Sequence, residues 1–192
     1  MALFILGAIL FFSSHLLPAF AGPRAALRER LGDGPYRGLY SLVALAGVVL
    51  IVMGYADWRF AGSPQLWDPP TFLRHLTLLL MLPVFPLLFA AYMPGRIKVA
   101  VKHPMILAVK VWAFAHLLAN GDLASMVLFG LFLAWGVVDR ISLKRREAAG
   151  LVRVSREGSA RYDLIAVALG LVVYGLFVWK LHTWLIGVPV IG

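Results

Sequence analysis

The 192-residue chain is 61% hydrophobic and only 14% charged, with a mean hydropathy of +0.87 and a formal net charge of +9. A soluble domain typically carries about a quarter charged residues, so this composition indicates an integral membrane protein. The absence of cysteine excludes disulfides, thiolate ligands, iron–sulfur clusters and a cysteine nucleophile. The basic residues fall between apolar runs, where they act as topology signals, and no nucleic-acid-binding motif is present.

Six apolar segments approach the roughly 20 residues that a bilayer span requires. They predict an all-α bundle of about six transmembrane helices in a single domain covering residues 1–192. The segments are Ala2–Phe20, Gly38–Tyr55, Phe72–Tyr92, Pro104–Leu118, Leu123–Val138 and Tyr162–Leu181. The first ends in Ala-Phe-Ala but has no basic residues before it, so we expect a retained span rather than a signal peptide.

The proline positions and the loops between the spans lead to further structural expectations. Pro83 and Pro86 should kink the third span. The fourth span is the shortest, and residues 119–122 join it tightly to the fifth, which predicts an antiparallel helical hairpin. The polar, basic segment Lys144–Arg161 is interpreted as a solvated loop or short surface helix that is attracted to anionic lipid.

The distribution of Lys and Arg predicts the orientation in the membrane. These residues gather in the first, third and fifth loops, whereas the second loop holds only Arg59 and the fourth holds none. By the positive-inside rule the odd-numbered loops are cytoplasmic, and both termini face the periplasm or exterior. We expect a multi-pass protein of the bacterial inner membrane.

The fourth span contains the side chains that are most able to bind a ligand or take part in a reaction. At about 100° per residue, Trp112, His116 and Asn120 share one helix face, and His103 and Lys110 share another. Lys110 could reach the cytoplasmic interface with its long side chain or could serve as a counter-charge. His116 lies deeper, where an ionisable side chain indicates either function or an interhelical hydrogen bond.

The other histidines are less specific. His15 in the first span could be an iron ligand or could form an interhelical hydrogen bond with help from its serine neighbours. His75 and His182 lie near outer span ends, where structural roles are common. No two histidines have the spacing of a local zinc site.

Two short motifs have structural explanations. In His103-Pro104 the proline suits the first turn of the fourth span. In Asn120-Gly121-Asp122 the glycine suits the end of one helix, and Asp122 suits the cap of the next.

Taken together, the motifs resemble one known family. The run "KHPM" followed by "KVWAFAHLLANGDLAS", with His116 thirteen residues after His103, and the earlier "FFSSHLLPAF" and "LRERLGDGPYRGLYSL", resemble the NnrU family of membrane proteins. The resemblance covers most of the chain, up to about Arg146. NnrU proteins are named for a link to nitric-oxide and nitrite reduction. The family is also similar to zeta-carotene isomerase, a membrane haem b enzyme.

The resemblance implies a haem b site. By motif His116 matches one histidine ligand of the isomerase, and His15 is the match for the other, with His103 as the alternative partner of His15. Asn120 and Asp122 would be turn residues or would support the site. The position three residues before His116, a cysteine in the isomerases, is Ala113. The ammonium groups of Lys102 and Lys110 are candidates for contacts with the haem propionates.

Several functions remain open at this stage. The resemblance implies cis–trans isomerisation of a carotenoid-like polyene at the haem iron. The alternatives are a non-enzymatic haem-based accessory or sensor protein in nitric oxide or nitrite metabolism, and a transporter or structural subunit without a cofactor. A histidine-proline pair at a span boundary also occurs in isoprenylcysteine-type methyltransferases, although the other motifs of those enzymes are missing.

Overall fold

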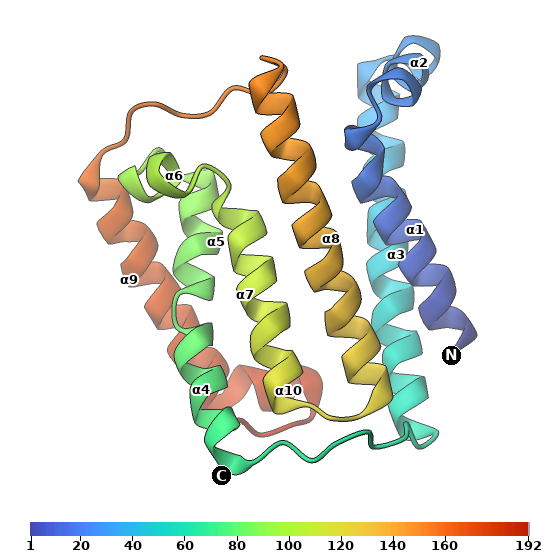
Figure 1. The fold of residues 1–192 in the computed structure, drawn as a ribbon, viewed down its shortest axis with the longest axis vertical. Helices are drawn as coiled ribbons and strands as arrows, with labels where there is room; N and C mark the ends of the chain where they lie inside the picture. The colour runs from blue at the N-terminus through green and yellow to red at the C-terminus, as the bar shows by residue number, and fades with distance from the viewer. Residues whose placement is uncertain (192) are drawn as a thin grey trace. The chain divides into compact units, whose positions relative to one another are not determined.

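The computed structural model describes residues 1–191, and these residues are predominantly helical (Figure 1). The helices are α1 (Ala2–Leu16), α2 (Ala21–Leu31), α3 (Asp33–Phe60), α4 (Thr71–Met81), α5 (Val84–Tyr92), α6 (Arg96–Val101), α7 (Pro104–Ala119), α8 (Leu123–Ala148), α9 (Ala160–Leu176) and α10 (His182–Ile186). A 3₁₀ turn (Leu17–Ala19) follows α1, and a π-helical turn (Phe177–Leu181) connects α9 to α10. Within the described residues, the only β-type pairing is an isolated bridge between Gln65 and Asp122. The all-α class is confirmed.

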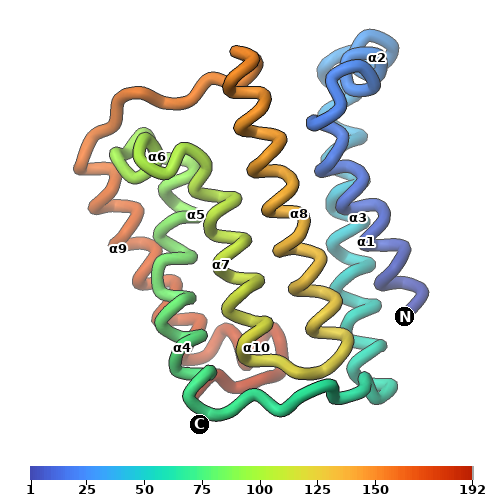
Figure 2. Tube along the Cα trace, viewed as in Figure 1, coloured from blue at the N-terminus to red at the C-terminus, as the bar shows by residue number. Residues whose placement is uncertain are grey.

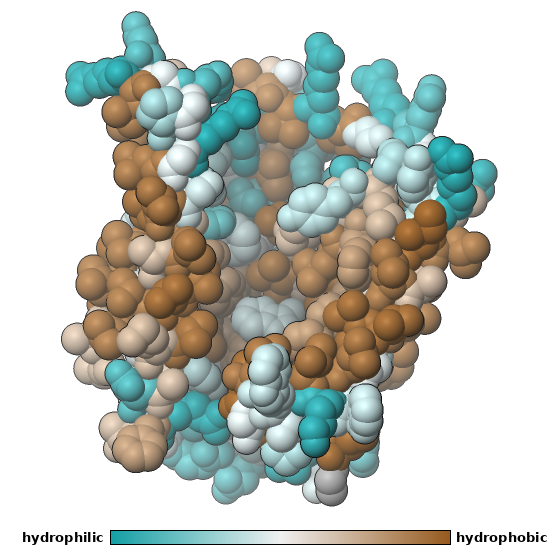
Figure 3. Space-filling model, turned by 180° about the vertical axis from the view of Figure 1, so that it is seen from behind, coloured by the Kyte–Doolittle hydropathy of each residue, from teal (hydrophilic) through white to brown (hydrophobic). Residues whose placement is uncertain are grey.

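Helix length and hydropathy agree with a membrane bundle. Within residues 1–191, five segments are long and apolar enough to cross a membrane: Ala2–Ala19, Asp33–Phe60, Thr71–Tyr92, Leu123–Ala148 and Ala160–Ile186. The remaining predicted segment, the fourth in chain order, is α7, whose 16 residues rise about 24 Å, less than the roughly 30 Å of the hydrocarbon core. Large apolar side chains are exposed along the helices, and polar ones gather at the helix ends of each unit defined below (Figure 3).

Several helix boundaries differ from the sequence predictions. Helix α8 continues ten residues past the predicted end at Val138, so the first part of segment 144–161 continues the fifth span instead of forming a separate loop or short surface helix. Lys, Arg, Glu and Ala are good helix formers, and polarity therefore ends the apolar span without ending the helix. Two short helices, α2 and α6, also lie within predicted loops.

The chain forms two compact units. Unit 1 comprises Met1–Trp67 and Gly121–Leu128, and unit 2 comprises residues 68–120 and the chain from Phe129 onward. The division falls inside α8. In unit 2, the tube in Figure 2 shows α6 at one end of the helices and α10 at the opposite end.

In unit 1, glycines allow α1 and α3 to pack closely. A Cβ atom on Gly54 would collide with the backbone of Phe4, and one on Gly47 would collide with Phe11. On the facing helix, a Cβ on Gly7 would meet the backbone of Ile51. Small residues at such an interface bring two membrane helices into van der Waals contact along their backbones.

In unit 2, the predicted proline kink is confirmed as a break between α4 and α5. Pro83 has no N–H to donate to Leu79, and the carbonyl of Leu79 instead accepts from the backbone N–H of Leu82 at 3.3 Å. The carbonyl of Leu78, which Leu82 would reach in a continuous helix, accepts the hydroxyl of Tyr174 from α9 at 2.9 Å.

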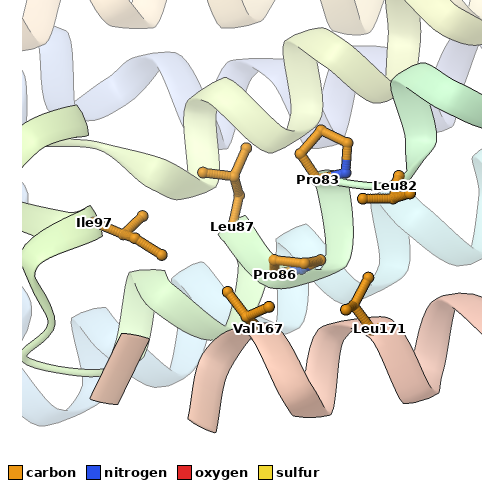
Figure 4. Close-up of a pocket in the computed structure, with 7 residues that line it drawn as sticks. All are labelled: Leu82, Pro83, Pro86, Leu87, Ile97, Val167 and Leu171. Atoms are coloured by element: carbon orange, nitrogen blue, oxygen red, sulfur yellow. The ribbon is translucent and has the colours of Figure 1, made fainter. Parts of the chain in front are cut away.

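The break also opens a shallow apolar pocket of about 270 Å³. Figure 4 shows its lining, in which side chains of α5 meet those of α6 and α9. The lining residues are Leu82, Pro83, Pro86, Leu87, Ile97, Val167 and Leu171.

The predicted hairpin is visible in unit 2 between α7 and the part of α8 after residue 128. His103, at the start of α7, contacts Glu147 near the end of α8. At the other end of α7, His116 packs on Phe129, with ring centroids 4.7 Å apart. The two helices are therefore antiparallel neighbours over most of the length of α7.

Candidate functional site

His116 lies in the last turn of α7 and is held by its own helix. Its Nδ1 lies 2.8 Å from the carbonyl oxygen of Trp112, one turn earlier. A carbonyl can only accept, so Nδ1 carries the proton of the neutral ring and Nε2 carries the lone pair. This arrangement is typical of histidines that bind metal through Nε2, because the second hydrogen bond fixes both the tautomer and the ring orientation.

Aromatic rings surround His116. Its ring centroid lies 5.3 Å from that of Trp112 and 4.7 Å from that of Phe129. Trp112 makes edge contacts with both Phe129 and Phe132 of α8. The imidazole is therefore held by packing on both α7 and α8, in an apolar environment that limits access of water.

Helix α4 supports the same part of α7. The hydroxyl of Thr77 donates to the carbonyl of Ala115, next to His116, at 2.8 Å. The side-chain amide of Asn120 donates to the carbonyl of His116, also at 2.8 Å. Asn120 therefore ends α7 by binding the backbone of His116 rather than its ring.

In unit 1, Asp122 acts as the predicted helix cap. Its carboxylate accepts the backbone N–H of Ser125 at 3.1 Å and the Ser125 hydroxyl at 2.5 Å. The hydroxyl of Tyr55 lies 2.8 Å from Ser125 Oγ and extends this buried network to α3.

The predicted role of Gly121 is corrected. Helix α7 ends at Asn120 in an extended conformation, and Gly121 lacks the positive φ of a glycine cap. The glycine is needed for a close approach, because a Cβ there would collide with the carbonyl of Trp67. That contact ties the turn to the 61–67 segment, where Gly121 O accepts the N–H of Leu66 at 2.8 Å.

His15 in unit 1 repeats the geometry of His116. Its Nδ1 lies 2.8 Å from the carbonyl of Phe11, four residues earlier, and its ring stacks on Phe11 at 4.0 Å. Its ring also lies 5.8 Å from that of Tyr40 on α3. The Ser14 hydroxyl donates to the Phe11 carbonyl within α1. His15 thus has the same tautomer as His116, and the two histidines belong to different units.

His103 belongs to a different cluster. Its Nε2 lies 2.5 Å from Glu147 Oε1, and Lys102 Nζ lies 3.2 Å from Glu147 Oε2. Thirteen residues separate His103 from His116 on α7, which amounts to about 20 Å of helix rise. The structure therefore brings Lys102 and His103 together with Glu147 and away from His116.

Lys110 lies between these two ends of α7. Its side chain runs over Gly136 of α8, where a Cβ atom would collide with the Lys110 Cγ. Its backbone lies six residues before His116, about 9 Å along the helix axis. Of the two predicted lysines, Lys110 therefore lies nearer to His116 along α7 than Lys102 does.

Sequence reasoning placed no weight on His182, whose Nδ1 also lies near a backbone carbonyl, although that carbonyl lies six residues later in the chain. The distance from Nδ1 to that carbonyl oxygen is 2.7 Å, which in the neutral ring places the lone pair on Nε2. The π-helical turn Phe177–Leu181 immediately precedes it, and such turns occur frequently at functional sites. His182 is in unit 2, as is His116.

Sequence reasoning also missed Glu147 and Arg140. Glu147 is the only acidic residue from position 140 to 156, within a strongly basic stretch. Arg140 lies seven residues earlier on α8, and its Nη1 is 3.2 Å from Glu147 Oε1. A lone carboxylate with a cation two turns away on the same helix face was the available signal.

The donors available to a metal or cofactor are therefore imidazoles. Within residues 1–191, no three His, Asp or Glu side chains are grouped so that they could hold a metal ion. Haem iron needs only one or two axial protein ligands, and histidines from bundle helices supply them in many proteins. The fixed Nε2 lone pair of His116 fits that chemistry.

The fold and the composition define a multi-pass α-helical membrane protein with exposed apolar helices and a half-buried imidazole packed between aromatic rings. The chain belongs to the NnrU family, whose family model, described as "NnrU protein", matches residues 3–190. The match covers segments of both units. Comparison with curated proteins and with solved structures finds no match.

Proposed function

We propose that this NnrU protein binds haem b in the bacterial inner membrane, with His116 as an axial ligand. The observation that carries the proposal is the hydrogen bond from His116 Nδ1 to Trp112 O, which leaves Nε2 as the lone-pair nitrogen. The resemblance supplies His15 as the second ligand, and its equivalent bond to Phe11 supports that choice.

The chain's own residues have distinct roles in this proposal. Trp112 and Phe129 hold the His116 ring in one orientation and limit access of water. Lys110 is the candidate for a propionate contact, because an ammonium group pairs well with a carboxylate. When bound, haem supplies an iron centre at which a small ligand or the double bond of a polyene can react.

We further propose a carotenoid-like polyene as the substrate and cis–trans isomerisation as the reaction. The shallow pocket at the α4–α5 break is lined entirely by apolar side chains and suits a hydrocarbon. The lipid-exposed helices give such a substrate a route from the bilayer. The alternative is nitric oxide binding without turnover, as in an accessory or sensor protein.

Absorption spectra of protein expressed with ample haem and purified in mild detergent test the proposal. We expect a sharp Soret band and low-spin reduced bands in the wild type, and loss of both in His116→Ala. His15→Ala and His182→Ala report which histidine is the second ligand, and His75→Ala is the matched control. Folded wild-type protein that stays colourless after haem titration would refute the proposal.

A second measurement separates the two activities. The haem-loaded protein is incubated with a cis-polyene in detergent, and the isomers are separated by chromatography. Trans product formed by the wild type and not by His116→Ala supports the isomerase. A nitric oxide complex without any polyene turnover supports the accessory or sensor role instead.

A further inference from the structure

A second built site lies at the opposite end of α7, in what we name the Glu147 cluster: Lys102, His103, Arg140 and Glu147. Three side chains converge on one carboxylate, His103 at 2.5 Å and Lys102 and Arg140 at 3.2 Å each. All four residues lie in unit 2. The proposed haem site uses none of these contacts.

The backbone at Lys102 is strained to form this cluster. Lys102 has φ 66° and ψ −51°, and within residues 1–191 no other non-glycine residue has a positive φ. The N–H of His103 donates to the carbonyl of Val101 at 2.8 Å, which closes a γ-turn of the rare positive-φ type. Strained non-glycine residues concentrate at functional sites, where the surrounding structure holds them in place.

The exposure of the four side chains is uneven. The Glu147 and His103 side chains are 11% and 16% exposed, whereas those of Arg140 and Lys102 are 33% and 48% exposed. The carboxylate therefore lies inside and fixes the positions of two cations that face outward. One carboxylate offsets only one of these two cations, so the cluster has excess positive charge even with His103 neutral.

Helix α8 extends this positive surface next to apolar side chains. Lys144 lies one turn after Arg140 and is exposed. On the same helix face, Val137 and Ile141 are large apolar residues that are also exposed. A cationic patch that directly adjoins an apolar helix surface complements an anionic phospholipid, whose negative phosphate lies above its apolar acyl chains.

We propose that Arg140, Lys144 and Lys102 bind the phosphate of an anionic phospholipid, with Glu147 fixing Arg140 and Lys102 in place. Arginine and lysine are the side chains that bind phosphate best, and a preset arrangement loses less side-chain entropy on binding. The positive-inside rule assigns this end of α8 to the cytoplasmic leaflet, where anionic lipids attract basic residues.

Native mass spectrometry of the detergent-purified protein, titrated with phosphatidylglycerol or phosphatidylcholine, tests this site. We expect the wild type to bind phosphatidylglycerol selectively. Lys144→Gln should weaken binding about fivefold, and Arg140→Gln with Lys144→Gln about 25-fold, at roughly one cation's contribution each. Lys144 makes none of the three contacts to Glu147 described above, so Lys144→Gln tests the lipid site without disturbing the Glu147 cluster.

The matched control removes two exposed cations elsewhere on the same predicted side, as Arg153→Gln with Arg156→Gln. Equal weakening by both double variants would show diffuse charge attraction and overturn the proposal. Inorganic phosphate at millimolar concentration provides the second arm. If free phosphate alone displaces the lipid, the site binds inorganic phosphate, and the proposal that it binds a phospholipid is wrong. Loss of haem binding with lipid selectivity intact would refute only the proposed function.

Discussion

Tyr174→Phe tests how the break between α4 and α5 is stabilised. The substitution removes only the hydroxyl that donates to the Leu78 carbonyl at 2.9 Å. Leu78 loses its helical donor because the N–H of Leu82 bonds to Leu79 instead. The variant therefore leaves a carbonyl without a donor in an apolar environment, where no water replaces the bond.

The size of the effect follows from that unpaired carbonyl. Leaving a buried acceptor unsatisfied costs about 1–3 kcal/mol, whereas side-chain hydrogen bonds between membrane helices average about 0.6 kcal/mol. Tyr174 is half-buried, so we expect a loss of about 1.5 kcal/mol in the free energy of unfolding. For a chain of this length, that loss lowers the thermal midpoint by about 3–6 °C.

Thermal unfolding in a single detergent, followed by circular dichroism, measures the shift. Tyr92→Phe is the matched control, because Tyr92 is exposed and lies in the same unit. If Tyr174→Phe and Tyr92→Phe have the same midpoint, the hydroxyl does not stabilise the break, and the argument from the orphaned carbonyl is wrong.

Three further predictions test packing, the Glu147 cluster and topology. Gly54→Leu should prevent α1 from packing on α3 and abolish a cooperative thermal transition, whereas Gly38→Leu, whose Cβ meets open space, should leave the transition unchanged. Glu147→Gln should speed hydrogen–deuterium exchange in the last two turns of α8, because it weakens three contacts to the carboxylate; unchanged exchange would count against the cluster. Since the chain has no cysteine, Asp68→Cys should react with an impermeant maleimide in intact cells and Ser155→Cys should not, and the reverse pattern would invert the predicted orientation.

The sequence predicted the helices well because apolar length is a direct signal of a span. All six predicted segments are helical, and the break at Pro83 follows from the missing N–H. The helix cap formed by Asp122 was also predictable from the local sequence, because an Asp carboxylate can accept a backbone N–H in the first turn of the helix that follows it. These features depend on residues close together in the chain.

The rest depended on contacts between distant residues. The approach of Gly121 to the carbonyl of Trp67 cannot be read from the turn itself, which also suited a glycine cap. The pairing of His103 with Glu147 joins residues 44 positions apart and requires α8 to continue beyond its apolar part. Helix propensity gave no reason to end α8 at Val138, so hydropathy alone set that boundary too early.

His15 and His116 share a local sequence pattern that gives structural information beyond hydropathy. Phe11 precedes His15 by four residues, as Trp112 precedes His116, and in each case Nδ1 reaches the carbonyl of the aromatic residue. That carbonyl is also the acceptor for the histidine's own backbone N–H in a regular helix, so the bond requires the ring to lie back along the preceding turn. The aromatic ring at that position then packs against the imidazole. At both positions the backbone carbonyl therefore sets the tautomer of the neutral ring, with its lone pair on Nε2, and the aromatic side chain of the same residue packs against the ring and holds its orientation.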